Sequence, residues 1–434
     1  MKTKIQQRSL TDCLDNVIDY RGKTPKKLGL EWCNVGYRAI SANNVKFDGL
    51  TKIDSINCLD EAGYKKWMKE EVRKGDLLLT SEAPAGQVML WMNDEKIVLS
   101  QRLFALRTKP DVYNKYLKYY LQSNVGQFEI NKNTSGSTVF GISAKMFDFI
   151  KVNLPDYDSQ ISIGDILYLI DSKIELNNRI NAELEAMAKT LYDYWFVQFD
   201  FPIYNQDGTL SGAEGYKTSG GKMVWNEELK REIPEGWEVK LLGTEIEIQR
   251  GISYTSKEIN GDGIPMISLN SFNLNGTYKP EGIKKYSGKY TDKNNTKPGD
   301  LLIAATDVTR NADIIGRAIL VPDYYNGDLV FSMDIAKIIS KNIPSSFLMM
   351  LFNSNHYHNY IKWYASGTIV LHLNLDGTKR YNIELPPRNL LQKYDALYQP
   401  IADRIYKTAI ENQKLTELRD WLLPMLMNGQ VKVN

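Results

Sequence analysis

An internal duplication constrains this 434-residue sequence more than any other feature. Short motifs in the later part of the first half recur 231 residues further along, in the same order. The matching pairs are Ser123-Asn124 with Ser354-Asn355, Ser135-Gly136 with Ser366-Gly367, Leu154-Pro155 with Leu385-Pro386, and Asn181 with Asn412. One such match arises easily by chance, but an ordered series at one offset does not, so the chain contains two copies of one unit.

The two copies diverge toward their N-terminal ends. Gly75 in KGDLL matches Gly299 in PGDLL at an offset of 224 residues, and Arg21-Gly22 matches Arg250-Gly251 at 229. Changing offsets indicate insertions and deletions, which surface loops tolerate better than helices and strands do. We therefore expect a shared scaffold in the later part of each copy and differing loops in the earlier part.

Each copy begins with short apolar runs that are typical of β-strands, bounded by Gly, Pro and charged residues. The runs are 76–80, 87–92 and 103–108 in the first copy, and 300–306, 317–322 and 329–340 in the second. A helix of roughly four turns is expected next, near 113–128 and near 345–364. These patterns predict a mixed α+β domain of about 150 residues in each copy.

A long helix is expected after each domain. Residues 160–197 contain no Pro, and their apolar positions step by four and three residues, which predicts a heptad seam with Asn177 and Asn181 in its middle. The same seam recurs 231 residues on, with Asn412 in its middle, and ends at Pro424 and Asn428-Gly429. We expect the helices to pack antiparallel and the three amides to meet across the pair and fix its register, with an ordinary helical hairpin core as the alternative.

The expected fold class is thus α+β, with two tandem α/β domains separated by two long antiparallel coiled-coil helices and a pseudo-two-fold internal repeat. A stretch rich in Gly, Ser and charge precedes the second domain and is typical of a linker. The expected boundaries are 1–155 for the first domain, 156–200 for the first long helix, 201–237 for the linker, 238–386 for the second domain and 387–434 for the second long helix.

Composition limits the compartment and the partners. The three cysteines, Cys13, Cys33 and Cys58, form no CxxC pair, which is typical of a reducing compartment. The N-terminus does not resemble a signal peptide and no apolar run is long enough to span a bilayer, so a cytoplasmic protein is expected. The net charge is only +2, so binding to nucleic acid would require basic residues gathered on one face or partners that share the phosphate contacts.

Motifs of common nucleotide-dependent enzymes are missing from the sequence. Gly136 and Gly141 have the spacing of a phosphate-binding loop, but Ile-Ser follows where Lys-Ser or Lys-Thr is required. The (Asn/Asp)-Pro-Pro-(Tyr/Phe) motif of amino-methyltransferases does not occur. We therefore predict no catalytic residues in this chain.

Two further patterns are weak. Pro155-Asp156 followed by 171–173 (Asp-Ser-Lys) matches a loose nuclease pattern, but residues 171–173 fall in the predicted long helix, whereas nuclease carboxylates converge on a strand framework. His356 and His358 have no counterpart in the first copy, and we expect them on a surface helix. No metal site is predicted.

Several longer segments resemble one known family. LYDYWFVQFDFP (191–202) and residues 215–239 are similar to the central region of the specificity subunits of type I restriction–modification systems. Residues 135–155 resemble the end of their first target-recognition domain, and residues 415–431 resemble their C-terminal region. Together with the duplication, the resemblance covers essentially the whole chain.

This resemblance implies a subunit without catalytic activity. Each of two target-recognition domains would read one half of a bipartite DNA site, while the helix pair would set the gap and dock two modification (methyltransferase) subunits. The partners implied are double-stranded DNA, the methyltransferases with S-adenosylmethionine, and restriction subunits with ATP and Mg²⁺. The chain itself is expected to bind no cofactor.

Residues that read bases carry Arg, Lys, Asn, Gln, Ser, Thr or aromatic side chains on loops that reach a DNA groove. The candidates in the first domain are Arg21, Lys23, Lys26, Lys27, Arg38, Ser41, Asn43, Asn44, Ser137 and Thr138. Those in the second domain are Arg250, Tyr254, Ser268, Asn270, Thr309, Arg310, Asn311 and Thr368.

Two other functions remain open on the residues alone: a scaffold with two binding modules on a coiled-coil spacer, and a self-sufficient DNA methyltransferase, which the missing motif disfavours. A dense aromatic cluster gives one further expectation. Tyr192, Tyr194, Trp195 and Phe196 are too many for one helical seam, so we expect them to pack on a recognition domain or on a partner subunit.

Overall fold

The computed structural model describes residues 5–136, 140–202, 216–217, 222–323, 325 and 327–431. It divides into two compact units, of which unit 1 comprises Met1–Glu175 with Lys414–Asn434 and unit 2 comprises Leu176–Gln413. Each unit therefore contains one globular domain together with a segment of both long helices.

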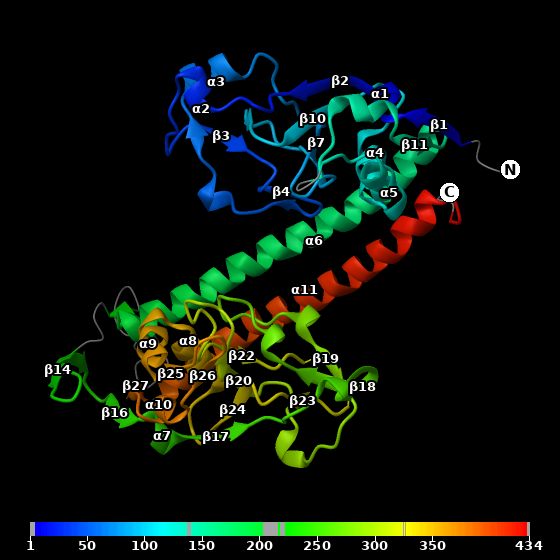
Figure 1. Ribbon diagram of the computed structural model, residues 1–434. Helices are drawn as coiled ribbons and strands as arrows, with labels where there is room; N and C mark the ends of the chain where they lie inside the picture. The colour runs from blue at the N-terminus through cyan, green and yellow to red at the C-terminus, as the bar shows by residue number, and fades with distance from the viewer. Residues whose placement is uncertain are drawn as a thin grey trace. The chain divides into compact units, whose positions relative to one another are not determined.

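The globular part of unit 1 is built on an antiparallel sheet with the strand order β2-β10-β7-β8 (Figure 1). The strands are β2 (Leu14–Asp19), β7 (Leu77–Thr80), β8 (Val88–Leu90) and β10 (Leu103–Thr108). Leu77 and Leu79 pack with the residues of one core cluster, and Leu78 packs with those of another. Both faces of β7 are therefore buried, which explains its unbroken apolar run.

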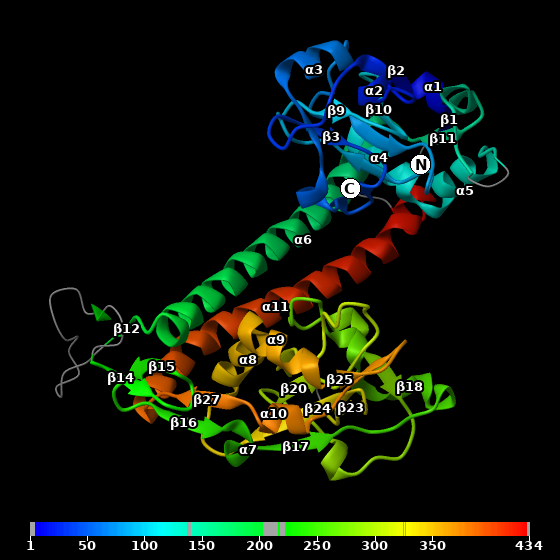
Figure 2. The same cartoon turned by 60° about the vertical axis from the view of Figure 1, so that its left-hand side comes forward.

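Unit 2 repeats this sheet in the order β17-β24-β20-β22, whose strands are labelled in Figure 1 and of which Figure 2 shows β17, β24 and β20 from another side. The strands are β17 (Ile246–Arg250), β20 (Leu301–Ala304), β22 (Ala318–Leu320) and β24 (Ile335–Ser340). Leu301 and Ile303 join one core cluster and Leu302 joins another, as their counterparts in unit 1 do. The predicted strand runs and the duplication are thus confirmed in three dimensions.

Smaller strand pairs are duplicated as well. In unit 1, β1 (Gln6–Ser9) pairs antiparallel with β11 (Lys151–Leu154), and β3 (Tyr37–Ile40) lies between β6 (Cys58–Leu59) and the parallel strand β9 (Val98–Leu99). In unit 2, β16 (Glu238–Leu241) pairs with β27 (Asn382–Leu385), and β18 (Ile259–Ile267) lies between β19 (Lys284–Tyr286) and the parallel strand β23 (Val330–Phe331).

The helix that we expected after the strands of each domain is two helices. Unit 1 has α4 (Asn114–Gln122) and α5 (Asn124–Lys132), and unit 2 has α8 (Ser345–Asn353) and α9 (Asn355–Ile361). Ser123 takes an extended conformation between α4 and α5, and its hydroxyl accepts the Gly126 N–H. Ser354 does the same for the Tyr357 N–H. A serine that caps a new helix ends the preceding one, which the sequence prediction missed.

The remaining elements are short. The stretch expected to be a linker contains a hairpin of β14 (Met223–Asn226) and β15 (Arg231–Pro234). The others are α1 (Leu10–Cys13), α2 (Pro25–Leu28), β4 (Val45–Lys46), β5 (Gly49–Leu50), α3 (Glu61–Trp67), β12 (Phe201–Pro202), β13 (Tyr216–Lys217), α7 (Leu242–Glu245), β21 (Thr306–Asp307), β25 (Ala365–Ser366), β26 (Leu371–Leu373) and α10 (Asp376–Lys379), with short 3-10 turns between them.

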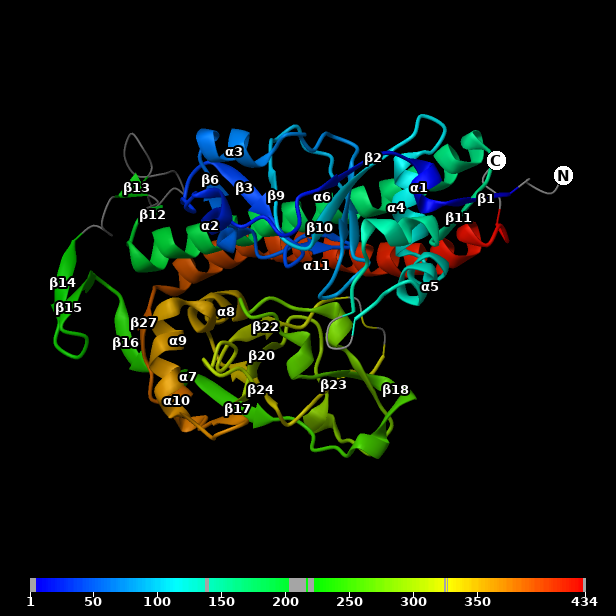
Figure 3. The same ribbon diagram turned by 45° about the horizontal axis from the view of Figure 1, so that its top comes forward.

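The two long helices are α6 (Tyr157–Tyr192), which continues into a π-helical turn (Asp193–Val197), and α11 (Arg388–Met427). They pack side by side (Figure 3). The helix α11 ends directly before Asn428-Gly429, as expected, but it runs three residues beyond Pro424, so the expected end at this proline is wrong. Pro424 has no N–H to donate to the preceding turn, but its carbonyl still accepts the Asn428 N–H at 3.0 Å. Gly429 then turns the chain with a φ of 67°.

The predicted seam is the buried side of these helices. In unit 1 it contributes Leu167 and Leu426 to the core, and in unit 2 Asn177, Tyr394 and Tyr398 are buried. Contacts between the helices run antiparallel within each unit. Among the helices of the described ranges, none is both long and apolar enough to cross a lipid bilayer.

The aromatic cluster after α6 packs within unit 2. Tyr192, Trp195 and Phe196 are buried against α11 and the second domain, where Phe196 lies 4.9 Å from the ring of Tyr394. Tyr194 is exposed. Three of the four rings thus pack on the second globular domain, which matches the first of the two placements we expected.

Candidate nucleic-acid interface and helix pair

Two candidate loops of unit 2 lie side by side because one small sheet joins them. In that sheet β26 lies between β21 and β25, and Asp307 at the end of β21 is paired with Leu371 at the start of β26. Residues 308–311 follow β21 at the edge where residues 367–370 connect β25 to β26. The candidates Thr309, Arg310, Asn311 and Thr368 therefore come from neighbouring loops.

A buried carboxylate, which sequence reasoning missed, holds the first of these loops. Asp307 is fully buried, and its two oxygens accept the N–H groups of Thr309 at 2.6 Å, Ile314 at 2.6 Å and Ile315 at 3.0 Å. The Thr309 hydroxyl accepts the Asp313 N–H at 2.8 Å. The loop is therefore fixed from inside, which leaves Arg310 and Asn311 exposed at its surface.

The other candidates of unit 2 fall into two groups: exposed side chains, and engaged side chains, which already form hydrogen bonds within the domain. Arg250, Asn270 and Thr368 are exposed. Ser268 is buried and its hydroxyl donates to the Gly282 carbonyl, while the Tyr254 hydroxyl accepts the Lys284 ammonium at 2.7 Å. The side chains of Ser268 and Tyr254 therefore form hydrogen bonds within the domain.

In unit 1 most of the basic candidates are engaged. The Arg21 guanidinium lies 3.9 Å over the Phe104 ring and donates to Asp19 and to the Ile142 carbonyl. The ammonium groups of Lys23 and Lys27 donate to backbone carbonyls, and the Arg38 guanidinium pairs with Glu95. Lys26 is exposed.

The second candidate loop of unit 1 shows the same division. Asn44 is buried, and its side-chain oxygen accepts both the hydroxyl and the backbone N–H of Ser41. Asn43 beside it is exposed. Ser137 and Thr138 lie outside the described residues.

The three seam amides lie between the long helices in unit 2. Asn177 is fully buried and donates to Glu411 and to Asn412 at 2.8 Å each. Asn412 donates in turn to Asn178 at 2.7 Å. Asn181 donates to the Ile405 carbonyl and accepts the Thr408 hydroxyl. These hydrogen bonds form in a single register, because a shift by one turn would separate every pair.

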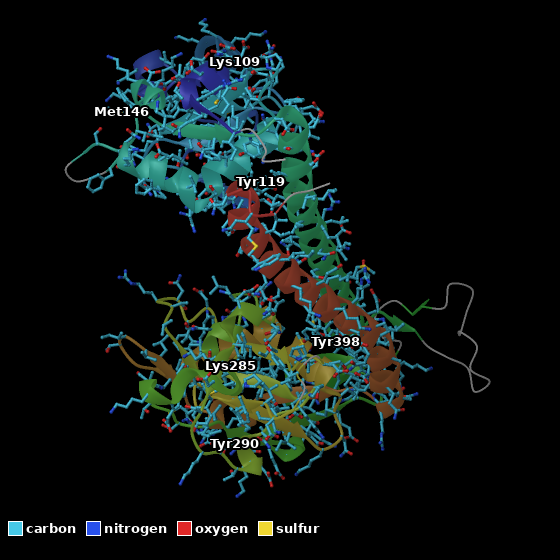
Figure 4. The ribbon with its side chains drawn as sticks, turned by 90° about the vertical axis from the view of Figure 1, so that its right-hand side faces the viewer. Lys109, Tyr119, Met146, Lys285, Tyr290 and Tyr398 are labelled. Carbon is cyan, nitrogen blue, oxygen red and sulfur yellow. The ribbon has the colours of Figure 1, made fainter. Side chains whose placement is uncertain are left out.

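In unit 1 a buried ion cluster joins the helix pair to the domain. Asp171 of α6 accepts Arg419 of α11 at 3.0 Å, and it also accepts the Lys118 ammonium at 2.7 Å and the Tyr119 hydroxyl at 2.6 Å, both from α4. Arg419 reaches Asp48 of the domain at 2.9 Å. Figure 4 labels Tyr119 at this junction. Burial raises the pKa of Asp171, but the two cations outweigh it and hold that pKa below its usual value.

The histidine prediction is wrong for one residue. His356 is exposed, but His358 is buried and its Nδ1 lies 3.1 Å from the Ile315 carbonyl oxygen. Burial lowers the pKa of His358 to about 4, so its ring is neutral near pH 7. In the part of the chain that the structure describes, no cluster of potential metal ligands surrounds it.

Comparison with known proteins decides which family this architecture represents. The model of the family described as type I restriction modification DNA specificity domain matches residues 8–186 and again residues 234–420. The chain belongs to this family. It is a type I specificity subunit with two target-recognition domains, itself non-catalytic, and the two matches correspond to the two copies of the repeat.

Individual relatives agree with the assignment of this specificity subunit. The MjaIX specificity subunit of Methanocaldococcus jannaschii is 26% identical over 381 residues, which cover 83% of this chain and 78% of the relative. The HindI specificity subunit of Haemophilus influenzae is 25% identical over 414 residues, which cover 84% and 88%. The crystal structure of a type I S subunit from M. genitalium has the same fold, with a TM-score of 0.64 and 14% identity over 98% of this chain and 96% of that one.

Proposed function

We propose that each target-recognition domain of this specificity subunit reads one half of a bipartite DNA site, and that the helix pair sets the gap and docks two methyltransferase subunits. The observation that carries this proposal is the contrast within the repeat. The sheets and helices of the two domains correspond, whereas the loops that carry the candidate residues differ in length and sequence. A shared scaffold with two different sets of loops suits two different half-sites.

The exposed side chains have the chemistry of base readout. Arginine forms paired hydrogen bonds to guanine, and asparagine does so to adenine, in the major groove. In the second domain Arg250, Asn270, Arg310, Asn311 and Thr368 are free to reach DNA. In the first domain Lys26 and Asn43 are exposed, and Lys27 is exposed as well but donates to the Gly22 carbonyl. The engaged residues, such as Arg21 and Ser268, would shape the loops that present them.

The helix pair suits the role of a spacer. A helix of 36 residues such as α6 is about 54 Å long, which exceeds the rise of one DNA turn, about 34 Å. The buried amides would fix the helix register and with it the gap between the half-sites. The domain boundaries proposed for this arrangement are 1–155 and 238–386, with the helices at 156–200 and 387–434 and a linker at 201–237.

Apolar side chains on the outer faces of the helices support docking of partner proteins. Leu169 and Trp421 in unit 1 are 66% and 56% exposed, and Met187 in unit 2 is 58% exposed. Such residues mark interaction surfaces when they gather in patches. The methyltransferases would supply S-adenosylmethionine and much of the phosphate contact that a net charge of +2 does not, and restriction subunits would supply ATP and Mg²⁺ chemistry in the cytoplasm.

Methylome sequencing of cells with and without this chain, in the presence of its methyltransferase, tests the proposal. We expect one split motif to be methylated only when the chain is present. A methylome that is unchanged by deleting the chain from an active system would contradict the proposal and would favour a scaffold unrelated to DNA.

A further inference from the structure

Unit 2 contains a pocket of about 570 Å³ between the second domain, α6 and α11. Its walls are mainly apolar and include Met349 and Met350 from α8 and Tyr398, Ala402 and Tyr406 from α11. Figure 4 labels Tyr398 in this region. The volume falls within the range of about 300–1,000 Å³ that is typical of small-molecule sites.

The duplication explains why the pocket exists. The residues 231 positions after Lys118 and Asp171 are Met349 and Ala402, and the residue 231 positions before Arg419 is Ala188. These three residues line the pocket, whereas their counterparts form the buried ion cluster of unit 1. Two alanines in place of Asp171 and Arg419 leave the space that charged side chains fill in unit 1.

The pocket also contains a carboxylate that lacks a cation. Glu185 of α6 lines it and accepts the Asn275 side-chain N–H at 3.4 Å. Within the described ranges no Lys or Arg forms an ion pair with Glu185, and the nearby Lys189 is paired with Asp193. Burial raises the pKa of Glu185, as expected for a carboxylate removed from water without a positive partner.

Two other polar groups of the pocket lining, both tyrosine hydroxyls, are hydrogen-bonded away from Glu185. The Tyr398 hydroxyl donates to the Met349 sulfur at 3.1 Å, and the Tyr406 hydroxyl donates to the Leu320 carbonyl at 3.1 Å. The carbon atoms of these two rings therefore form part of the pocket's apolar wall. Aromatic rings and thioether sulfurs contact a cationic group with an apolar body favourably.

We propose that this pocket binds a small organic cation, an ammonium or guanidinium group on an apolar and preferably aromatic body. The cation pairs with Glu185, and the body packs against Met349, Tyr398 and Tyr406. In unit 1 the guanidinium of Arg419, a residue of the chain itself, occupies the corresponding position. Unit 2 has Ala188 there, so the bound ligand would supply the positive charge that unit 2 lacks. This binding site is separate from the DNA-reading loops and does not depend on the proposed function.

Titration calorimetry with the full-length chain and three matched probes tests this inference. The probes are 4-phenylbutylamine, 4-phenylbutanol and 4-phenylbutyrate, which share an apolar body and carry a positive, a neutral and a negative head. We expect the amine to bind at least about tenfold more tightly than the alcohol, because a close charge pair in a partly desolvated binding site contributes about one decade of affinity or more. The carboxylate should bind weakest. Equal binding of amine and alcohol, or binding of none of the three, would overturn the proposal.

Two variants locate the site. Glu185→Gln removes the charge with little change in shape, and Ala188→Arg introduces the cation that Arg419 provides in unit 1. Both should lower the amine affinity by about tenfold or more, to that of the alcohol. Glu183→Gln, an exposed carboxylate on the same helix that does not line the pocket, should leave the affinity unchanged.

A melting curve of each variant shows whether it is folded. If Ala188→Arg does not fold, Glu185→Gln alone is enough to test the location of the site. Unchanged amine binding in folded Glu185→Gln would overturn the assignment of the site. If only a partner protein, and no probe, contacts Glu185 in a crosslinking experiment, the pocket is a docking surface and the proposal of a small ligand is wrong.

Discussion

In each unit the domain meets the helix pair at corresponding positions of the repeat, which are charged in unit 1 and apolar in unit 2. In unit 1, Asp171 is surrounded by Lys118, Tyr119 and Arg419. In unit 2, Met349, Ala402 and Ala188 occupy the positions of the three charged residues and leave an apolar pocket. The shared helices and sheets therefore accommodate either a charged cluster or an apolar pocket at this junction. The two copies of the repeat differ where the domain meets the helix pair. The following predictions test this comparison.

Breaking the ion cluster should have the largest effect. Asp171→Ala leaves Lys118 and Arg419 buried without their shared partner, so we expect the free energy of unfolding of unit 1 to fall by about 3–5 kcal/mol. Chemical denaturation followed by circular dichroism measures the loss.

The triple variant Lys118→Met, Asp171→Ala and Arg419→Ala is the matched control, because it gives unit 1 the residues of unit 2. It should recover most of the stability, since no buried charge is left unpaired. A triple variant as unstable as Asp171→Ala would show that the unit 1 junction cannot adopt the apolar solution, and would contradict the comparison.

A change in one set of loops should affect one half-site only. Arg310 is exposed in unit 2, and a guanidinium that reads a guanine contributes about 1–3 kcal/mol of discrimination against other bases. Arg310→Ala should therefore relax methylation at one position of one half-site, as methylome sequencing would record. Relaxed specificity in both halves would contradict the assignment of one domain to one half-site, and Lys341→Ala, an exposed residue away from these loops, is the control.

Much of this fold was predictable because its signals are periodic and repeated. The heptad spacing located α6 and α11, and the apolar runs located β7, β10, β20 and β24. The break between α4 and α5 was missed although Ser123 and Ser354 recur at the common offset. A serine within a helical pattern is compatible with both a continuous helix and a cap, and only the packing of the following helix decides between them.

The division of the candidate site into exposed and engaged residues was not predictable. Arg21 and Lys23 each donate to a backbone carbonyl, of Ile142 and Trp67 respectively, that is distant in sequence and carries no side-chain signal. The unit 1 ion cluster was missed for a similar reason. Arg419 occupies a seam position of α11, and the sequence carries no sign that the fold places Asp48 and Asp171 beside it.

The seam amides should contribute a moderate and local effect. Asn177 is fully buried and donates to Glu411 and Asn412, so Asn177→Ala removes both hydrogen bonds across the helix pair. We expect the free energy of unfolding of unit 2 to fall by about 1–3 kcal/mol. Arg179→Ala on the exposed face is the control, and equal losses for the two variants would show that the amide layer does not stabilise one register.

The helix caps should give the smallest effect and the same one in both copies. Ser123 and Ser354 each accept one N–H at 3.2 Å at the start of a helix. Replacing either with alanine should lower the free energy of unfolding of its own unit by about 1 kcal/mol. Markedly unequal losses would show that the shared scaffold has diverged as the junctions have.

The most direct test of the account is a domain exchange. Residues 1–155 are replaced with the matching segment of a relative that has a different methylated motif, and the methylome is sequenced. The account predicts that one half of the split motif changes to the relative's half-site, while the other half and the gap between them stay the same. A change in both halves, or in the gap alone, would contradict the claim that two independent readers share one spacer.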